Sequence, residues 1–352
     1  MVNYSRYFLK TKSTQLNIDT MGKKFTTVDL FAGAGGLTEG FKMAGFETIA
    51  ANEIVPTYSE TYKLNNPNVK IFTEDIRNIT VEQFKKECKI NGKKVDVLIG
   101  GPPCQGFSMA GMRDPKDPRN SLFMDFIRFV DGLKPTFFVM ENVPGILTMK
   151  TAKGEKVIDL ICKEYERIGY KFKYKKLHAA DYGVPQKRKR VIFIGTNTNK
   201  DINYPKPTHD KEAYKTIEGK QIKKWVGAET ILLPKNKVPK NFFLSEKMIN
   251  GFIKRREQNK KKGRGFGWQI IDPKTPCYTI SARYWKDGSD ALVKYSDKEI
   301  RMLTPKEAAA IQTFPQNFKF FGSKRDVYTQ IGNAVPVLLA KAIAEEIKKS
   351  LD

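Results

Sequence analysis

The sequence predicts an α/β protein in which a doubly wound, mostly parallel sheet is joined to a smaller and irregular domain. Short apolar segments alternate with helical segments from residue 26 to residue 195, and such alternation is typical of parallel sheets flanked by helices. Beyond residue 195 this rhythm fades into a stretch rich in proline and lysine. The length of 352 residues suits one large domain and a smaller one.

The strands and helices of the large domain follow one another in order. Strands are expected at 26–31, 48–53, 70–76, 95–101, 136–143, 171–179 and 190–195. Helices are expected at 37–46, after residue 53 as far as Tyr62, around 81–90, at 121–133 and at about 156–167. The segment 121–133, for example, carries its apolar residues at helical spacing.

Helical patterns return near the C-terminus, at 304–314 and at 335–351. Thr304 and Glu307 have the spacing of a capping box, and Pro305 suits the first helical turn. The densest basic tract, 254–268, lies before them and is either a solvated loop or a nucleic-acid contact. The aromatic residues within that tract favour the contact.

The charge balance favours a polyanionic partner. Lysine and arginine total 63 against 38 acidic residues, a net charge of +25. Such an excess can serve solubility alone, but a broad basic surface most often binds nucleic acid. The charge carries no information about base sequence.

Cysteine usage and hydropathy exclude several other classes. The four cysteines lie far apart without a CxxC motif, and there are only two histidines, so neither a disulfide framework nor a metal site is expected. No apolar run reaches the roughly 18 residues that a membrane span needs. The N-terminus lacks the apolar core of a signal peptide, so we expect a cytoplasmic protein.

A glycine-rich loop joins the first strand to its helix. Gly33, Gly35 and Gly36 allow a tight turn and the close approach of a ligand, although a purely structural turn remains possible. Thr38 breaks the dinucleotide spacing GxGxxG, and no lysine follows as in a P-loop. Glu53 ends the second strand and could bind ribose hydroxyls. With Asp75 at the third strand end as an acceptor for an adenine amino group, S-adenosylmethionine fits best.

Three further features follow the next strands. Cys104 stands behind two glycines and two prolines, where cations or backbone N–H groups could generate its thiolate. Glu141 ends the fifth strand and could hold or deliver a proton. In the segment 186–190, Gln186, Arg188 and Arg190 share one face of an extended chain and the two lysines the other. A buried core cysteine and a salt-bridged glutamate are the bland alternatives.

Together these segments resemble the DNA (cytosine-5)-methyltransferase family, of the bacterial restriction-modification type. The resemblance covers nearly everything from Thr26 to Ile347. It rests on DLFAGAGGLTEGF, Glu53, EDI, GGPPCQGFS, RNSLF, MENVPG, QKRKR, RMLTPKEAAAIQTFP and QIGNAVP. The GGPPCQGFS and MENVPG elements are highly specific. The implied fold is the Rossmann-like fold of S-adenosylmethionine-dependent methyltransferases.

The resemblance implies a mechanism in which a cytosine is flipped out of the duplex. Cys104 would then attack C6 and raise the electron density at C5. Glu141 would engage N3 and the exocyclic amino group, Arg190 would hold O2, and Arg188 would support the cleft. The catalytic residues are thus expected to be Cys104, Glu141, Arg188 and Arg190, and the base that removes the C5 proton is not identified.

The resemblance also implies binding residues. The cofactor S-adenosyl-L-methionine, which leaves as S-adenosyl-L-homocysteine, would lie against Phe31, Ala32, Gly33, Gly35, Gly36, Leu37, Glu53, Ile54, Asp75, Ile76, Pro103, Leu122, Asn333 and Val335. The segment 105–120 would form a loop that closes over the flipped base, and 196–300 would recognise the target. The candidate DNA contacts are Gln105, Ser108, Arg113, Arg264, Thr279, Arg283, Tyr284 and Trp285.

These roles divide the chain into four parts. We expect an N-terminal extension at 1–20, a catalytic and cofactor-binding domain at 21–198, and a small target-recognition domain at 199–319. The segment 320–352 would return to the catalytic domain.

The resemblance implies double-stranded DNA as the partner, no membrane, action at the bacterial nucleoid, and a monomer. A cognate restriction endonuclease could act on the same site without a stable complex. Two alternatives stay open: a tRNA cytosine-5 methyltransferase, and an inactive nucleic-acid-binding relative. An adenine N6-methyltransferase is disfavoured because a cysteine, not an aromatic residue, follows Pro102 and Pro103.

Overall fold

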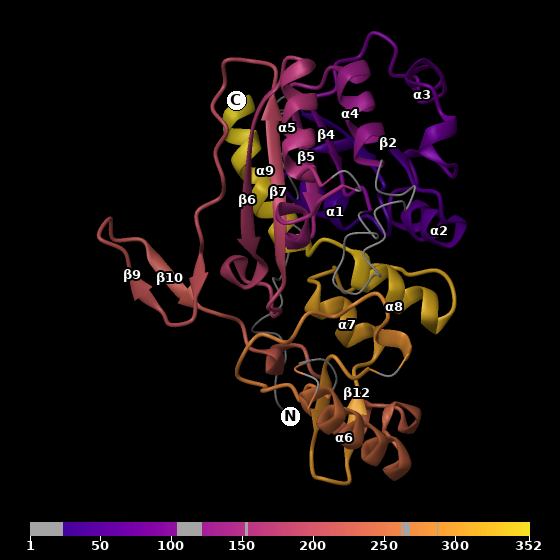
Figure 1. Ribbon diagram of the computed structural model, residues 1–352, viewed down its shortest axis with the longest axis vertical. Coiled ribbons are helices and arrows are strands. Elements are labelled where there is room, and N and C mark those ends of the chain that lie inside the picture. The colour runs from indigo at the N-terminus through magenta and orange to yellow at the C-terminus, as the bar shows by residue number, and fades with distance from the viewer. Residues whose placement is uncertain (1–23, 104–121, 152–153, 262, 264–267, 287) are drawn as a thin grey trace, which may run out of the picture.

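The computed structural model describes residues 24–103, 122–151, 154–261, 263, 268–286 and 288–352. A seven-stranded sheet with helices on both faces forms the larger part, and a smaller part with helices and short strands lies beyond one end of it (Figure 1). Cys104, Gln105, Ser108, Arg113 and Arg264 lie outside the described residues.

The seven strands confirm the predicted α/β class. They are β1 (Thr26–Leu30), β2 (Glu47–Asn52), β3 (Lys70–Phe72), β4 (Val97–Gly100), β5 (Phe137–Asn142), β6 (Lys171–His178) and β7 (Lys189–Thr196). Their order is β3-β2-β1-β4-β5-β7-β6, and the first five run parallel. The strand β7 runs antiparallel to both of its neighbours. The carboxyl ends of β1 to β5 therefore meet at one edge, where open α/β sheets bind ligands.

Each face of the sheet buries its own hydrophobic core. On one face α1 (Gly36–Met43) and α9 (Val337–Leu351) pack over Val97 and Val139. On the other, α3 (Val81–Glu87), α4 (Leu122–Leu133) and α5 (Val157–Arg167) pack over Leu98 and Phe138. Neighbouring residues of one strand thus enter different cores, as the alternation of side chains along a strand requires. The helix α2 (Pro56–Asn65) follows β2.

The last helix returns to the first through very close contacts. A Cβ atom at Gly40 of α1 would lie 2.4 Å from Cβ of Ala340 in α9. A Cβ atom at Gly36 would lie 2.5 Å from the carbonyl oxygen of Val335. Because real Cβ atoms do not approach other atoms so closely, these two glycines permit the docking of the C-terminal segment.

The smaller part has a hydrophobic core of its own. Its elements are α6 (Glu246–Lys261), β11 (Leu292–Lys294), β12 (Ile300–Met302), α7 (Pro305–Ile311) and α8 (Lys324–Asn333). The capping box of Thr304 and Glu307 at the start of α7 is confirmed. Two helices were not expected from the sequence: α8, and α6, which includes the first half of the basic tract at 254–268. Only Ile249 and Phe252 of α6 are buried, so its apolar stripe is short.

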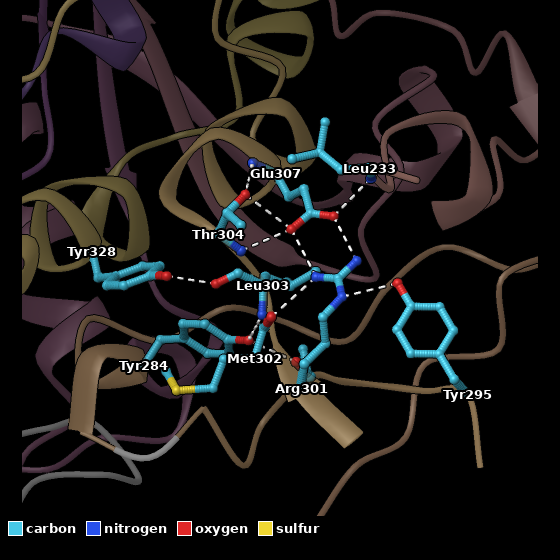
Figure 2. A network of polar contacts seen from close by, with 10 residues as sticks. Leu233, Tyr284, Tyr295, Arg301, Met302, Leu303, Thr304, Glu307 and Tyr328 are labelled. Carbon is cyan, nitrogen blue, oxygen red and sulfur yellow. Dashed lines mark hydrogen bonds and ion pairs between the residues drawn. The ribbon is translucent and has the colours of Figure 1, made fainter. Parts of the chain in front are cut away.

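A buried ion pair stands at the centre of the smaller part (Figure 2). Both oxygens of Glu307 accept from the Arg301 guanidinium at 2.9 Å, and both side chains are fully shielded from solvent. Glu307 also accepts from the backbone N–H groups of Leu233 and Thr304, and Arg301 donates to the Tyr295 hydroxyl. The network joins β12 and α7 to the loop at Leu233, which is distant in the sequence.

A third, small sheet lies outside the two cores of the large sheet and the core of the smaller part. Its strands are β8 (His209–Asp210), β9 (Tyr214–Lys215) and β10 (Gln221–Lys224), in the order β8-β10-β9. Figure 1 shows this arm projecting sideways at the level where the two parts meet. No helix of the described residues is long and apolar enough to cross a membrane.

The packing suggests a refined division of the chain. Tyr328 and Ile331 of α8 belong to the core of the smaller part, whereas Val335 and Leu339 belong to a core of the sheet. We therefore propose that the chain returns to the first domain after Asn333 and not at residue 320.

Candidate active site

The glycine loop between β1 and α1 has the tight geometry expected of it. Gly33 and Gly35 have φ angles of 57° and 93°, and Phe31 also lies in the left-handed region, at 57°. Such angles favour glycine because they bring a Cβ atom against the backbone. The Gly33 amide donates to Oε2 of Glu53 at 2.8 Å. The loop after β1 is thus tied directly to the end of β2.

Glu53 is held as a hydrogen-bond acceptor at this edge. Its second oxygen accepts from the Val55 amide at 2.9 Å, and the residue is only 7% exposed. Burial raises the pKa of Glu53, and the two amides oppose that rise. A buried carboxylate with its direction fixed by two N–H groups is suited to accept from a pair of hydroxyls.

The end of β3 adds a second carboxylate. Asp75 accepts from the amide of Arg77 at 3.0 Å and pairs with its guanidinium at 2.5 Å, and the hydrogen bonds from Arg77 lower the pKa of Asp75. Asp75 therefore stays ionised as an acceptor. Nearby in the chain, the Ile54 side chain is 53% exposed. An exposed apolar side chain that follows Glu53 in the chain is suited to cover a flat ring.

The other residues predicted to bind the cofactor lie on several different elements. Ile76 and Leu122 lie in the core on one face of the sheet, whereas Leu37 and Val335 lie in the core on the other. Pro103 follows β4, and Asn333 is exposed at the last position of α8. The structure thus brings the glycine loop into contact with Glu53 and, through Gly36, with Val335.

A buried polar chain beneath the glycine loop was not anticipated from the sequence. The Thr38 hydroxyl donates to Oδ2 of Asp29 at 2.6 Å and lies 2.8 Å from the Tyr62 hydroxyl. Asp29 is fully buried, and Oδ1 has no hydrogen-bond partner among the described residues. Burial, with a contribution from Glu53, raises the pKa of Asp29 to about 7. A carboxylate within an apolar strand was the sequence feature that could have indicated this buried polar chain.

The ends of β4, β5 and β7 form the second part of the site. Oε1 of Glu141 lies 2.5 Å from Nε of Arg190. The Asn142 amide donates to the carbonyl oxygen of Pro102 at 3.2 Å, joining β5 to the segment after β4. Cys104 follows that segment and lies outside the described residues. Glu141, Arg190 and the backbone that leads to Cys104 therefore share one edge of the sheet.

Arg188 occupies a different position from Arg190. It is 1% exposed, and its guanidinium donates to the carbonyl oxygens of Ile280 at 3.2 Å and Gly332 at 2.8 Å. Its Nε has no partner among the described residues. Burial, reinforced by the charge of Arg190, holds the pKa of Arg188 well below its usual range. Arg188 thus connects the end of the sheet to the smaller part.

Two glutamines beside Arg188 were not recognised as a pair from sequence. The Gln186 amide donates to Oε1 of Gln312 at 3.0 Å, and its own oxygen accepts from the Ile280 amide. Gln312 donates in turn to the carbonyl oxygen of Ile331 at 2.8 Å. The predicted alternation is present, because Gln186 and Arg188 are buried between exposed Lys187 and Lys189. The alternation was visible in the sequence, but the sequence did not show which surface the face of Gln186 and Arg188 contacts.

The candidate DNA contacts separate into exposed and buried residues. Arg283 is exposed, Trp285 is partly exposed against Arg325, and the Thr279 hydroxyl donates to the carbonyl oxygen of Lys187. The prediction for Tyr284 is corrected by its burial. Tyr284 is 1% exposed, and its hydroxyl donates to Ala291 and accepts from the Leu303 amide. It is a core residue of the smaller part.

A match to a family model decides the family of this chain. The model of the C-5 cytosine-specific DNA methylases matches residues 25–349. The chain belongs to the C-5 cytosine-specific DNA methylase family. This C5 methylase fold and family imply the use of S-adenosylmethionine and a DNA substrate.

Similar proteins agree with this family. The chain is 38% identical to the type II methyltransferase M.DdeI of Desulfomicrobium norvegicum, over 91% of this chain and 88% of that protein. It is also 38% identical to M1.HphI of Haemophilus parahaemolyticus, over 92% and 87%. A solved structure of a prophage-encoded E. coli protein, named as a DNA modification methyltransferase, is 27% identical with a TM-score of 0.69, over 93% and 99%.

Proposed function

We propose that this C5 methylase is a DNA (cytosine-5-)-methyltransferase that modifies a specific cytosine in double-stranded DNA. The observation that carries the proposal is the pair of Glu141 and Arg190 at the sheet edge that also holds the glycine loop. A carboxyl group that can meet N3 and the amino group of cytosine, beside a cation that can meet O2, is complementary to one edge of that base.

The cofactor would lie along the ends of β1, β2 and β3. Glu53 would accept from the ribose hydroxyls, Asp75 would accept from the adenine amino group, and Ile54 would cover the ring. The buried, amide-bound carboxylate of Glu53 supports this fit. S-adenosylmethionine supplies an electrophilic methyl group when it is bound there.

The residues of this chain would activate the base on the other side. The Cys104 thiolate would form a bond to C6. A proton held by Glu141 at N3 would stabilise the electron density that this addition pushes into the ring. After C5 is methylated, loss of the C5 proton and of the thiolate restores the aromatic ring. Arg188 is buried against Ile280 and Gly332 and would act by fixing the segment that leads to Arg190 against the smaller part.

The similarity to type II methyltransferases suggests a biological role. We propose that the protein is the modification enzyme of a restriction-modification system and acts as a monomer, with an endonuclease that reads the same site separately. The exposed surface of the smaller part, with Arg283 and Trp285, would face the target bases.

The test combines mapping with covalent trapping. Plasmid DNA is incubated with the protein and S-adenosylmethionine, and methylated cytosines are mapped by bisulfite sequencing. A duplex with 5-fluorocytosine at the mapped position should then form a covalent complex that depends on the cofactor. Fluorine takes the place of the C5 hydrogen, so no proton can leave C5 and the thiolate is not eliminated.

Cysteine variants make the trapping specific. Cys104→Ser should form no covalent complex. Cys162→Ser, at a partly exposed cysteine on α5, is the matched control and should trap normally. Trapping by Cys104→Ser would overturn the nucleophile, and methylation of tRNA in place of DNA would overturn the substrate.

A further inference from the structure

The arm formed by β8, β10 and β9 has no evident structural purpose of its own. Of the residues at 211–224, only Ile222 is buried, and the arm belongs to none of the hydrophobic cores. Tyr214 and Ile217 are 48% and 107% exposed. Two- to four-residue strands without a core contribute little to stability, so the arm is more readily explained as a binding element.

The root of the arm is fixed to the large domain through Asp181. The carbonyl oxygen of Asp181 accepts from the Thr208 amide at 2.9 Å, and Oδ1 accepts from Trp225 Nε1 at 3.0 Å. His178 Nδ1 lies 3.2 Å from the same carboxylate oxygen, and its ring meets the Trp225 ring edge-on at 5.2 Å. The two ends of the arm, at Thr208 and Trp225, are therefore anchored beside the end of β6.

A pocket of about 660 Å³ opens where the arm meets the body. It is lined by Pro144, His178, Lys187, Lys189, Arg190, Trp225 and Thr279. Arg190 is paired with Glu141, whereas Lys187 and Lys189 have no carboxylate within ion-pair distance among the described residues. The pocket is therefore basic, and it is continuous with the site proposed for the target base.

The arm continues this basic character away from the site. Lys224 pairs with Glu212. Lys215, Lys220 and Lys223 are exposed, and none has an ion-pair partner within the part of the chain that the structure describes. Unpaired lysines on a fixed, projecting sheet are complementary to a regularly charged polyanion.

We propose that the arm, residues 209–225, and the pocket at its root bind the DNA backbone that flanks the target cytosine. Lys187 and Lys189 would hold phosphates next to the flipped nucleotide. Trp225 and Pro144 would contact deoxyribose, and Lys215, Lys220 and Lys223 would reach phosphates farther along the duplex. This inference rests on the proposed DNA substrate and extends the contact surface beyond the bases that are recognised.

The salt dependence of binding tests the arm. The variant Lys215→Gln/Lys220→Gln/Lys223→Gln is compared with the unmodified protein in binding to a long duplex containing the mapped site. Each phosphate that a protein neutralises adds about 0.9 to the slope of log affinity against log salt. The arm variant should lower the magnitude of that slope by about 0.9 for every phosphate that the arm no longer neutralises, and its KM for plasmid DNA should rise.

A control variant separates contact from total charge. Lys86→Gln/Lys93→Gln/Lys163→Gln removes three exposed lysines in and after α3 and in α5, far from the arm in Figure 1. It should leave the slope nearly unchanged. On a duplex trimmed to the mapped site, the arm variant should match the unmodified protein.

The result that would overturn the inference is an arm variant whose slope and KM equal those of the control variant. Failure of the proposed function is a separate outcome. In that case the unmodified protein would methylate no DNA, whatever the state of the arm.

Discussion

Two buried arginines show how differently the two parts of the molecule treat charge. In the smaller part, Arg301 is paired with both oxygens of Glu307 (Figure 2). Although burial opposes its charge, this partner raises the pKa of Arg301. At the junction, Arg188 donates to two carbonyl oxygens and has no carboxylate partner within the described part of the chain, and burial lowers its pKa.

The same contrast holds for the carboxylates. Glu307 accepts at both oxygens, whereas Asp29 under the glycine loop leaves one oxygen without a partner among the described residues. The smaller part thus uses buried charge to define its fold, and the compensation is complete. The sheet edge, where we place the chemistry, keeps charges that the surrounding protein compensates only in part. Perturbed ionisable groups are typical of functional sites.

The largest effect is expected for Glu307→Ala. Removing one partner of a buried ion pair leaves an uncompensated charge and should lower the free energy of unfolding by about 3–5 kcal/mol. Urea unfolding followed by tryptophan fluorescence reports on this region, since Trp268 and Trp285 both lie in the smaller part. The double variant Arg301→Met/Glu307→Leu is the control and should be much closer to the unmodified protein. Equal losses in both variants would show that packing, not charge, dominates.

The next effect is a pH dependence caused by Asp29. Its pKa is about 7 in the folded protein and near 4 in the unfolded chain. The protonated form favours folding, so the contribution of this group to stability should be greatest below pH 4, fall as the pH rises from about 4 to about 7, and level off above that pH. The loss amounts to at most about 4 kcal/mol.

Asp29→Asn should remove this component of the pH dependence. The measurement is the urea midpoint of both proteins from pH 4 to pH 8. Parallel curves for the two proteins would mean that Asp29 does not titrate in this range.

The smallest effect on stability is expected for Arg188→Met. Two hydrogen bonds are removed, but the penalty of a buried, unpaired cation is also removed, so the free energy of unfolding should change by no more than about 2 kcal/mol. The rate of methyl transfer should nevertheless fall at least tenfold, because the segment that leads to Arg190 loses its anchor. We expect kcat to change by a larger factor than KM for DNA. Arg188→Lys keeps a charge without the fork to both carbonyls, and we expect it to be less stable than the Met variant. A loss of stability as large as that of Glu307→Ala would refute the distinction between the two regions.

Local patterns predicted the sheet and which polar residues lie at the edge where its parallel strands end. Most strands contain a short apolar run, and a residue at the end of a strand is placed by the direction of that strand, so Glu53 and Glu141 could be assigned to one edge. The alternation around Arg188 was also visible. The partners of that face were not, because Ile280 and Gly332 lie 92 and 144 residues away along the chain.

The smaller part was less predictable for the same reason. Tyr284 stands among basic and polar residues and resembles a DNA contact, but β11 and the chain before α7 cover it. The helix α6 buries only two of its side chains, so its sequence shows charge more clearly than periodicity. Cores assembled from distant, short segments leave little trace in any one of them.

The contact between α1 and α9 has a consequence for synthesis on the ribosome. The helix α1 can contact α9, around Ala340, only after the segment that contains Ala340 has emerged from the ribosome. The smaller part is translated before that moment and has its own core. It can therefore fold while the large domain still lacks one of the two helices on that face. Docking of the 15-residue helix α9 then completes the packing of a domain whose first strand emerged long before it.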